Sequence, residues 1–396
     1  MPRGAEQELL CSGTDILFLQ VSIDMKIFHC DHCGQLLFFE NSRCVNCGHA
    51  LAYLPDLQTV ASLEATADEQ WCSPLPEAAG RTYRLCQNYE ENICNWAVPA
   101  NDPHPFCESC RTTLVIPDLT VAGHKEAWFQ LETAKRRLFY SLMYLGLHVR
   151  SRDDDPEYGL GFQFLAADAP GDAPVMTGHD DGIITINLAE ADHAKREEAR
   201  LALGEPYRTV LGHFRHEIGH YFWDQLIKDS AQIEDFRKLF GDERQDYEAA
   251  LKQHYAAGVA NWNQPNWQDN FVSAYASSHP WEDWAETWAH YLHMADALET
   301  AHACGLTLAP ARDDEPSLEA DKTLAADEAS VGDMVRDWVA LTYVLNNLNR
   351  SLGLSDAYPF VLSAAVIEKL EFVHKLIAAA KTKTAAPEKE TEMAME

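Results

Sequence analysis

Two closely spaced pairs of cysteines near the N-terminus constrain the fold of this chain more than any other feature. The pairs are Cys30-x2-Cys33 and Cys44-x2-Cys47, with ten residues between them, and a glycine follows the second cysteine of each pair. Two such knuckles are typical of a zinc ribbon, in which four thiolates hold one zinc ion. We therefore predict a structural zinc site on Cys30, Cys33, Cys44 and Cys47.

A second group of cysteines follows within the next seventy residues. Cys107-x2-Cys110 forms one more knuckle, while Cys86 and Cys94 stand apart from each other. We interpret these four residues as a second tetrahedral zinc site, of which only one half has the knuckle spacing. Clustered thiolate pairs in a chain with 11 cysteines, an odd number, are typical of a reducing compartment, so we expect the cytoplasm. The remaining cysteines are expected to bind no metal: Cys11, Cys72 and Cys304.

The pattern of apolar residues changes near residue 120, which indicates two domains. The N-terminal part has little apolar periodicity, so we expect residues 25–118 to form a zinc-ribbon domain in which metal replaces the hydrophobic core. Met25 is a second possible start, and residues 1–24 are expected to lie outside the fold. The residues 381–396 are expected to form a disordered charged tail.

Residues 119–380 are expected to form a larger, mainly helical domain. Apolar residues from Trp128 to Leu145 recur at mostly three- and four-residue steps, which predicts an amphipathic helix. Two segments, 160–166 and 182–188, are predicted to be strands, and the chain after residue 206 is predicted to be helical. The fold class is therefore α+β, with a small zinc-ribbon domain before a mainly helical one.

The segment His216-Glu217-Ile218-Gly219-His220 carries the chemistry that we expect of the larger domain. A helix places His216 and His220 on one face, aimed at one cation. Glu217 then lies beside the metal, where its carboxylate can take a proton from a zinc-bound water whose pKa is lowered to ~7. The alternative is a helix with two ordinary histidines.

A catalytic zinc site needs a third protein ligand. The metzincin arrangement requires a histidine at position 226 and a glycine at 223, and this chain has Leu226 and Trp223 there, so that class is excluded. The segment 281–290 is the better source of a ligand. Its tryptophans can pack on one side of a helix, while three polar residues fall on one stripe at four-residue steps: Glu282, Glu286 and His290.

A carboxylate ligand on a second helix resembles the gluzincin class of zinc peptidases. In that class an acid four residues after the ligand hydrogen-bonds a ligand histidine. The resemblance implies that Glu282 binds zinc and that Glu286 is its outer partner. His290 or Asp283 could replace Glu282, and solvated acids are the other interpretation.

Tyr275 precedes Glu282 by seven residues, a separation similar to that in lethal-factor-type gluzincin toxins. In those toxins the tyrosine hydroxyl stabilises the tetrahedral oxyanion, so the resemblance implies this role for Tyr275. His279 is the second candidate, and a packed loop tyrosine is the alternative reading.

The whole pattern resembles the bacterial zinc-binding metallopeptidases that carry an N-terminal zinc-ribbon domain. The resemblance covers about residues 25–380, and it implies a zincin-like peptidase fold and zinc but no particular substrate. Besides the two cysteine groups and the two helices, it includes Cys86-Gln87-Asn88-Tyr89, Cys94-Asn95-Trp96 and Tyr358-Pro359-Phe360-Val361.

The charge limits the partners. With 62 acidic and 31 basic residues the net charge is −31, which argues against nucleic acid and against an anionic membrane surface. We therefore expect a peptide or protein substrate, with the ribbon as a possible surface for a protein partner.

We predict zinc-dependent hydrolysis of peptide bonds, with one catalytic zinc and one or two structural zinc ions. Glu217 is the general base and Tyr275 the oxyanion donor. Segment 182–188 could be the edge strand that binds the peptide, or an interior strand. Two alternatives stay open: a catalytically silent zincin-fold adaptor, and a zinc hydrolase that acts on another amide or an ester.

Overall fold

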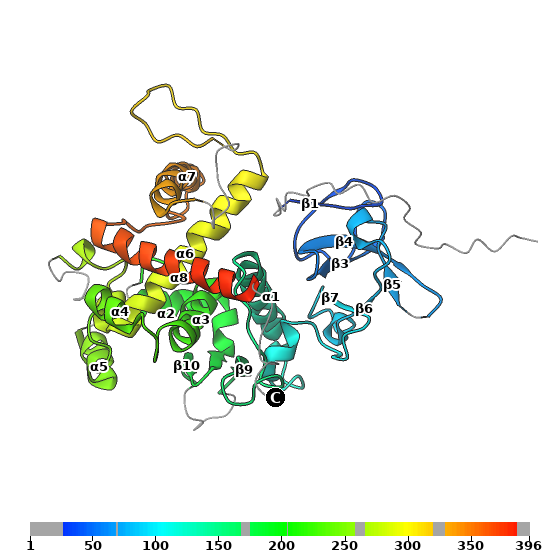
Figure 1. Ribbon diagram of the computed structural model, residues 1–396, viewed down its shortest axis with the longest axis horizontal. Helices are drawn as coiled ribbons and strands as arrows, with labels where there is room; N and C mark the ends of the chain where they lie inside the picture. Colours follow the sequence, from blue (N-terminus) through cyan, green and yellow to red (C-terminus); the bar gives the residue numbers. More distant parts are fainter. Residues whose placement is uncertain are drawn as a thin grey trace, which may run out of the picture. The chain divides into compact units, whose positions relative to one another are not determined.

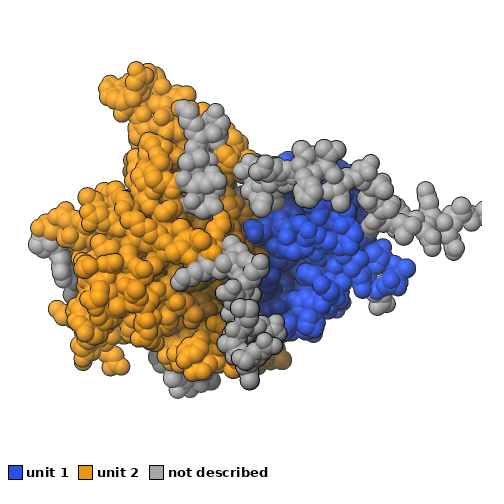
Figure 2. All heavy atoms as spheres, in the orientation of Figure 1, with its two compact units in different colours: residues 1–111 blue, residues 112–396 orange. Residues whose placement is uncertain are grey.

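The chain divides into two compact units, residues 1–111 and 112–396, which Figure 2 colours separately. The computed structural model describes residues 27–68, 70–167, 175–203, 205–257, 266–319 and 329–385. The expected N-terminal extension, residues 1–24, lies outside this range. Each unit is described by itself below.

The N-terminal unit consists of short antiparallel strands (Figure 1). A two-stranded hairpin, β1 (Phe28–His29) and β2 (Leu36–Leu37), carries the first cysteine knuckle on its turn. A five-stranded sheet in the order β3-β4-β5-β6-β7 follows. Its strands are β3 (Ala50–Leu54), β4 (Thr59–Ala65), β5 (Trp71–Cys72), β6 (Tyr83–Leu85) and β7 (Ala97–Pro99).

The N-terminal unit has a hydrophobic core of its own, so the expectation that metal replaces the core was wrong. Alternate residues of β3 and β4 point to one side of the sheet and meet residues of the later strands there. Many of these residues are alanines, and small residues give little apolar periodicity in the sequence. The core residues are Ala52, Leu54, Ala61, Leu63, Ala78, Tyr83 and Ala97.

The C-terminal unit contains a four-stranded sheet in the order β10-β11-β9-β8. β9 (Gly161–Leu165) pairs in parallel with β8 (Thr113–Val115) and with β11 (Ile183–Asn187). The edge strand β10 (Gly178–Asp180) is antiparallel to β11. Of the two alternatives for segment 182–188, an edge strand or an interior strand, the structure shows the interior strand. The edge strand next to it is β10.

Eight α-helices make up most of the rest of the C-terminal unit in the described part of the chain. They are α1 (His124–Tyr144), α2 (His193–Leu203), α3 (Val210–Leu226), α4 (Ile233–Phe240), α5 (Tyr247–Ala257), α6 (Pro280–Ala303), α7 (Val331–Ser351) and α8 (Ala364–Ala385). The helix expected from Trp128 onwards is α1. Helix α8 extends into the segment 381–396, because the alanines at 378–380 favour its continuation, and residues 386–396 lie outside the described range. Within the described residues, no helix is both long and apolar enough to cross a bilayer.

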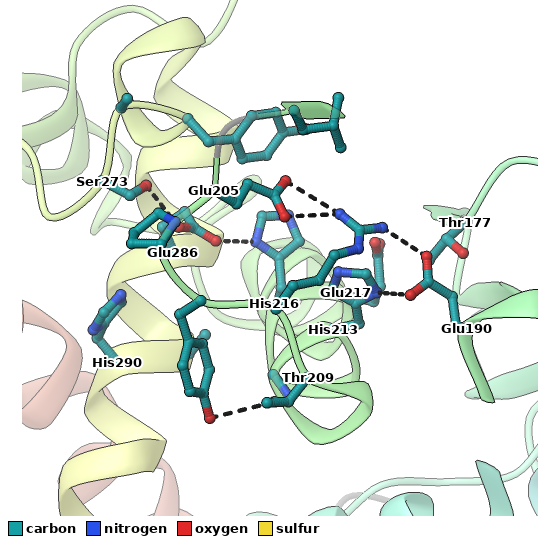
Figure 3. A pocket seen from close by; sticks show the side chains of 18 of the residues that line it. Thr177, Glu190, Glu205, Thr209, His213, His216, Glu217, Ser273, Glu286 and His290 are labelled. Atoms are coloured by element: carbon teal, nitrogen blue, oxygen red, sulfur yellow. Dashed lines mark hydrogen bonds and ion pairs between the residues drawn. The ribbon is translucent and has the colours of Figure 1, made fainter. Parts of the chain in front are cut away.

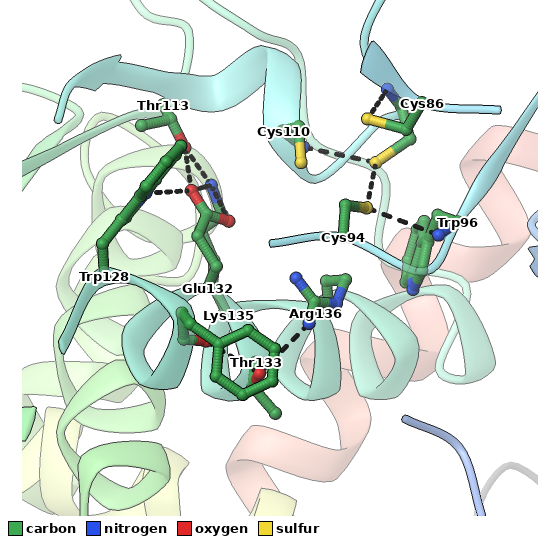
Figure 4. Close-up of polar contacts among 12 residues, drawn as sticks. Cys86, Cys94, Trp96, Cys110, Thr113, Trp128, Glu132, Thr133, Lys135 and Arg136 are labelled. Carbon is green, nitrogen blue, oxygen red and sulfur yellow. Dashed lines mark hydrogen bonds and ion pairs between the residues drawn. The ribbon is translucent and has the colours of Figure 1, made fainter. Parts of the chain in front are cut away.

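A buried ion pair fixes α1 against the sheet. Lys135 and Glu132 are both 0% exposed, and Lys135 Nζ lies 3.1 Å from Glu132 Oε2. The other carboxylate oxygen accepts hydrogen bonds from Thr113 Oγ1 of β8 and from Trp128 Nε1 (Figure 4). Because each charge has a partner, the pair tolerates burial and ties the first helix to the sheet.

Helices α3 and α6 pack closely, and a glycine makes this approach possible. A Cβ atom on Gly219 would lie 3.0 Å from Ala285 Cα and 3.2 Å from Trp288 Cβ, closer than normal contact. The indole of Trp284 donates a 2.7 Å hydrogen bond to the Gly219 carbonyl. The predicted packed side of the second helix is therefore buried against the helix that carries the two histidines.

Candidate metal centre

Three side chains from α3 and α6 converge on one point. His216 Nε2 lies 3.0 Å from Glu282 Oε2, and His220 Nε2 lies 3.7 Å from Glu282 Oε1. The three ligand atoms all lie within 4.8 Å of one another. Helix α3 begins after Thr209, whose hydroxyl caps it by accepting from the Gly212 amide, and this fixes the register of the histidine pair.

The donor set fits a zinc ion. Nitrogen and oxygen ligands 2.0–2.2 Å from a tetrahedral ion are separated by about 3.4 Å, and the two observed separations lie on either side of this value. Glu282 is 0% exposed, and its Oε2 atom has His216 Nε2 at 3.0 Å and no other polar partner in the described structure. A cation between this imidazole nitrogen and the buried carboxylate oxygen would satisfy both atoms. Burial alone would raise the pKa of Glu282, but the two histidines hold it well below its usual range.

Glu286 lies one turn after Glu282 and contacts a histidine. Its Oε1 atom is 2.8 Å from His216 Nδ1, and its Oε2 atom accepts a 2.6 Å hydrogen bond from Ser273 Oγ (Figure 3). The contact at Nδ1 leaves Nε2 of His216 as the nitrogen that faces Glu282. Such an outer carboxylate orients the ring and fixes its tautomer.

The two alternatives for the third ligand have other partners. His290 Nδ1 lies 2.6 Å from the hydroxyl of Tyr358. Asp283 accepts a 2.6 Å hydrogen bond from Lys369 Nζ of α8, and both side chains are buried. The geometry therefore favours Glu282 over His290 and Asp283.

Glu217 is buried beside the histidines and lines a cavity. Burial raises the pKa of this carboxyl to about 7, although the neighbouring His216 lowers it. A carboxylate with a pKa near neutrality can both accept and return a proton.

Tyr275 also lines the cavity, with its ring centroid 5.8 Å from that of His216. Burial raises the pKa of its phenol well above the usual value, so the hydroxyl stays protonated and can donate. The second oxyanion candidate, His279, instead caps α6, because its Nδ1 atom accepts from the Trp281 amide at 3.1 Å.

The cavity has a volume of about 580 Å³ and a charged wall opposite α6. Arg208 forms ion pairs with Glu190 at 2.6 Å and with Glu205 at 2.9 Å (Figure 3). His213, interpreted from sequence as an ordinary helical residue, lies 3.3 Å from Glu190 and lines the same wall. No motif in the sequence indicated this cluster.

Tyr247 contacts a candidate zinc ligand directly, and the sequence did not predict this contact. Its hydroxyl donates a 2.6 Å hydrogen bond to Glu282 Oε1. It lies at the first residue of α5, 35 residues before Glu282, and no local spacing links the two.

Both cysteine groups of the N-terminal unit have the geometry of four-thiolate zinc sites. Sulfur atoms 2.3 Å from a tetrahedral zinc ion are about 3.8 Å apart. The observed separations are 3.6 Å for Cys30–Cys47, 3.6 Å for Cys33–Cys44 and 3.7 Å for Cys94–Cys107. The ligand atoms of each group lie within 4.8 Å of one another, and Figure 4 shows Cys86, Cys94 and Cys110 of the second group, whose four members are buried. Cys72 and Cys304 belong to neither group, and Cys11 lies outside the described residues.

Comparison with known proteins gives matches over most of the chain. Residues 124–376 match a family model described as "Putative zinc-binding metallo-peptidase", and residues 27–121 match one described as "zinc-ribbon domain". The chain is 43% identical over 355 residues to uncharacterized proteins of Mycobacterium bovis and Mycobacterium tuberculosis, a stretch that covers 89% of this chain and 95% of each relative. No solved structure matches the chain.

Proposed function

Because the chain belongs to the family described as "Putative zinc-binding metallo-peptidase", we propose that it hydrolyses peptide bonds with a zinc ion held by His216, His220 and Glu282. The observation that carries this proposal is the convergence of these three ligands beside the buried carboxyl of Glu217. When bound, zinc supplies Lewis-acid activation of water and of the substrate carbonyl.

Three side chains do the remaining work in this proposal. Glu217 takes a proton from the attacking water and later gives it to the leaving amine. The hydroxyl of Tyr275 donates a hydrogen bond to the developing oxyanion. Glu286 keeps the ring of His216 in place, so that its Nε2 atom faces the metal position.

We also propose a zincin-like arrangement for the C-terminal unit and a zinc-ribbon domain for the N-terminal one. The boundary expected at 118/119 then moves to 111/112, because β8 (Thr113–Val115) pairs with β9 of the C-terminal sheet. Among the described strands β10 pairs only with β11, so an extended peptide can add to its other side. The cavity beside Glu217 then receives a side chain of the substrate. The cysteines arranged as metal ligands favour a reducing compartment such as the cytoplasm.

The test compares wild-type protein with Glu217→Gln on an unfolded protein substrate, with zinc counted by native mass spectrometry. We expect the variant to keep its zinc and to lose turnover, since an amide cannot accept the proton. Glu197→Gln, on α2, is the matched control and should keep full activity. Full activity of Glu217→Gln would contradict the mechanism.

The same experiment separates the two alternatives. Zinc-loaded wild-type protein that cleaves no peptide would favour the silent adaptor. Cleavage of non-peptide amides or esters alone would favour another zinc hydrolase.

A further inference from the structure

A third cluster of metal-binding side chains lies in the N-terminal unit, apart from both cysteine groups. It consists of His32, His49 and Glu64, whose ligand atoms all lie within 4.8 Å of one another. His32 stands inside the first knuckle, His49 follows the second, and Glu64 lies on β4. The four-cysteine sites use none of these residues.

A hydrogen-bonded clamp holds the first knuckle over β4. Asp31 Oδ2 accepts a 2.7 Å hydrogen bond from the Ser62 amide and a 3.3 Å hydrogen bond from its hydroxyl. Ser62 is 0% exposed. Because side chains alternate along a strand, Ser62 and Glu64 share the face of β4 opposite to the core residue Leu63. The hydrogen bonds between Asp31 and Ser62 therefore hold His32 next to Glu64.

One of the two histidines has a buried ring nitrogen without a hydrogen bond among the described residues. His49 Nδ1 is buried from solvent and has no hydrogen-bond partner in the described structure. The rings of His32 and His49 stack with centroids 3.8 Å apart and an interplanar angle of 26°. Stacking occupies the faces of the rings and leaves the buried ring nitrogen unsatisfied. A native structure that leaves such an atom unpaired calls for an explanation, and an ion is one.

We propose that His32, His49 and Glu64 bind a divalent transition-metal ion, with Zn²⁺ as the first candidate. Two imidazoles and one carboxylate suit Zn²⁺ or Ni²⁺ and do not suit Ca²⁺ or Mg²⁺, which prefer oxygen ligands only. The ring torsion of histidine is soft, so the stacked rings turn to direct both lone pairs at one ion.

This site differs in kind from the four-cysteine sites. It offers three protein ligands, which leaves a position for water. His32 is exposed, and His49 and Glu64 are half-buried, so the ion exchanges with solvent. The ribbon thus combines permanently bound structural zinc with one exchangeable ion.

The test uses the full chain, first treated with a mild chelator that leaves the four-cysteine ions in place. Zn²⁺ is then added back, and bound ions are counted by native mass spectrometry and by calorimetry. The variants are His49→Gln, His32→Gln and Glu64→Gln, and the control is His29→Gln, an exposed histidine of the same hairpin. Wild type should take up two added ions, one at the His216, His220 and Glu282 set and one at the ribbon. We expect each of the three variants to bind the second of these at least tenfold more weakly, since even outer-shell losses cost roughly 10–100-fold. The control should match wild type.

Glu64→Gln keeps the test decisive if a knuckle variant fails to fold, because Glu64 lies outside the knuckles. Its retention of the chelator-resistant ions shows that the ribbon is intact. If all folded variants bind the same number of Zn²⁺ ions as wild type with the same affinity, the proposal is wrong. Since the His216, His220 and Glu282 set is unchanged in every variant, this result is independent of peptidase activity.

Discussion

The hydroxyl of Tyr247 donates a 2.6 Å hydrogen bond to Glu282 Oε1, while Glu282 Oε2 has His216 Nε2 at 3.0 Å and no other polar partner among the described residues. The two oxygens of one carboxylate therefore have different environments. The first is held by a phenol from α5 and lies 3.7 Å from His220 Nε2, whereas the second lies 3.0 Å from His216 Nε2. This asymmetry favours Oε2 as the metal ligand and links α5 to the metal centre.

Removal of this hydroxyl should weaken the metal site. We expect Tyr247→Phe to lower zinc affinity roughly 10–100-fold, as the loss of outer-shell partners does. Competition with a chromogenic chelator measures the change. Tyr221→Phe, a buried tyrosine on α3, is the control. Equal zinc affinity in both variants would mean that the contact does not support the ligand.

Substitution of Glu282 should reduce zinc binding more severely than substitution of Glu286. Glu282→Ala removes a ligand and should abolish zinc binding at this centre, as His216→Ala should. Glu286→Ala removes only the contact to His216 Nδ1 and should cost roughly 10–100-fold in affinity or activity. Zinc content after dialysis against a mild chelator distinguishes the two. A Glu282→Ala protein that retains its zinc would refute the ligand assignment.

Tyr275→Phe should affect turnover more than binding. The loss of one oxyanion donor lowers kcat by about 10²–10³-fold, while KM and zinc content change little. Tyr343→Phe is the control, since that tyrosine is exposed on α7, does not line the cavity and should leave kcat unchanged. An unchanged kcat in Tyr275→Phe would leave the tyrosine as a packing residue.

Glu217 should make the metal-depleted C-terminal unit sensitive to pH. Burial raises the pKa of this acid from 4.5 to about 7, so its contribution to stability is full below pH 4.5 and is lost as pH rises through 7. Between pH 4 and 8 this loss is at most on the order of 3 kcal/mol. Glu217→Gln should therefore be more stable than wild type at pH 8 and similar at pH 4.5. Thermal unfolding after mild chelation tests this, and parallel pH profiles would contradict it.

The sequence predicted the parts of the centre that depend on local spacing. His216 and His220 are one helical turn apart, and Glu282 and Glu286 repeat the same step, so a helix alone places each pair on one face. The family resemblance drawn from these motifs is confirmed by the matches at 27–121 and 124–376.

Contacts between distant elements could not be predicted in this way. Tyr247 and Ser273 reach Glu282 and Glu286 only because α5 and the chain before α6 fold back onto the centre. The strand at 182–188 is apolar, but its interior position depends on β10, a three-residue edge strand with polar residues such as His179. A short polar segment carries no strand pattern, and strand order is a tertiary property.

The burial of charged side chains could not be predicted from the sequence either. Lys135 and Glu132 lie on a helix whose apolar stripe was recognised, yet both are fully buried as a pair. Sequence periodicity treats charged residues as exposed, and only the contact with Thr113 shows why these two are not.

Gly219 gives the histidine-bearing segment a constraint that its motif does not express. The motif allows any residue at this position, because the residue there binds no metal and takes part in no proton transfer. In this chain, however, the bulk at position 219 sets the spacing of the two ligand-bearing helices, since Ala285 and Trp288 lie directly against it. Any larger residue there widens the gap between the histidines and Glu282. Because the nearest atom is the backbone Cα of Ala285, no substitution at 285 makes room for a side chain at 219, so position 219 should stay glycine wherever this pair of helices keeps its spacing.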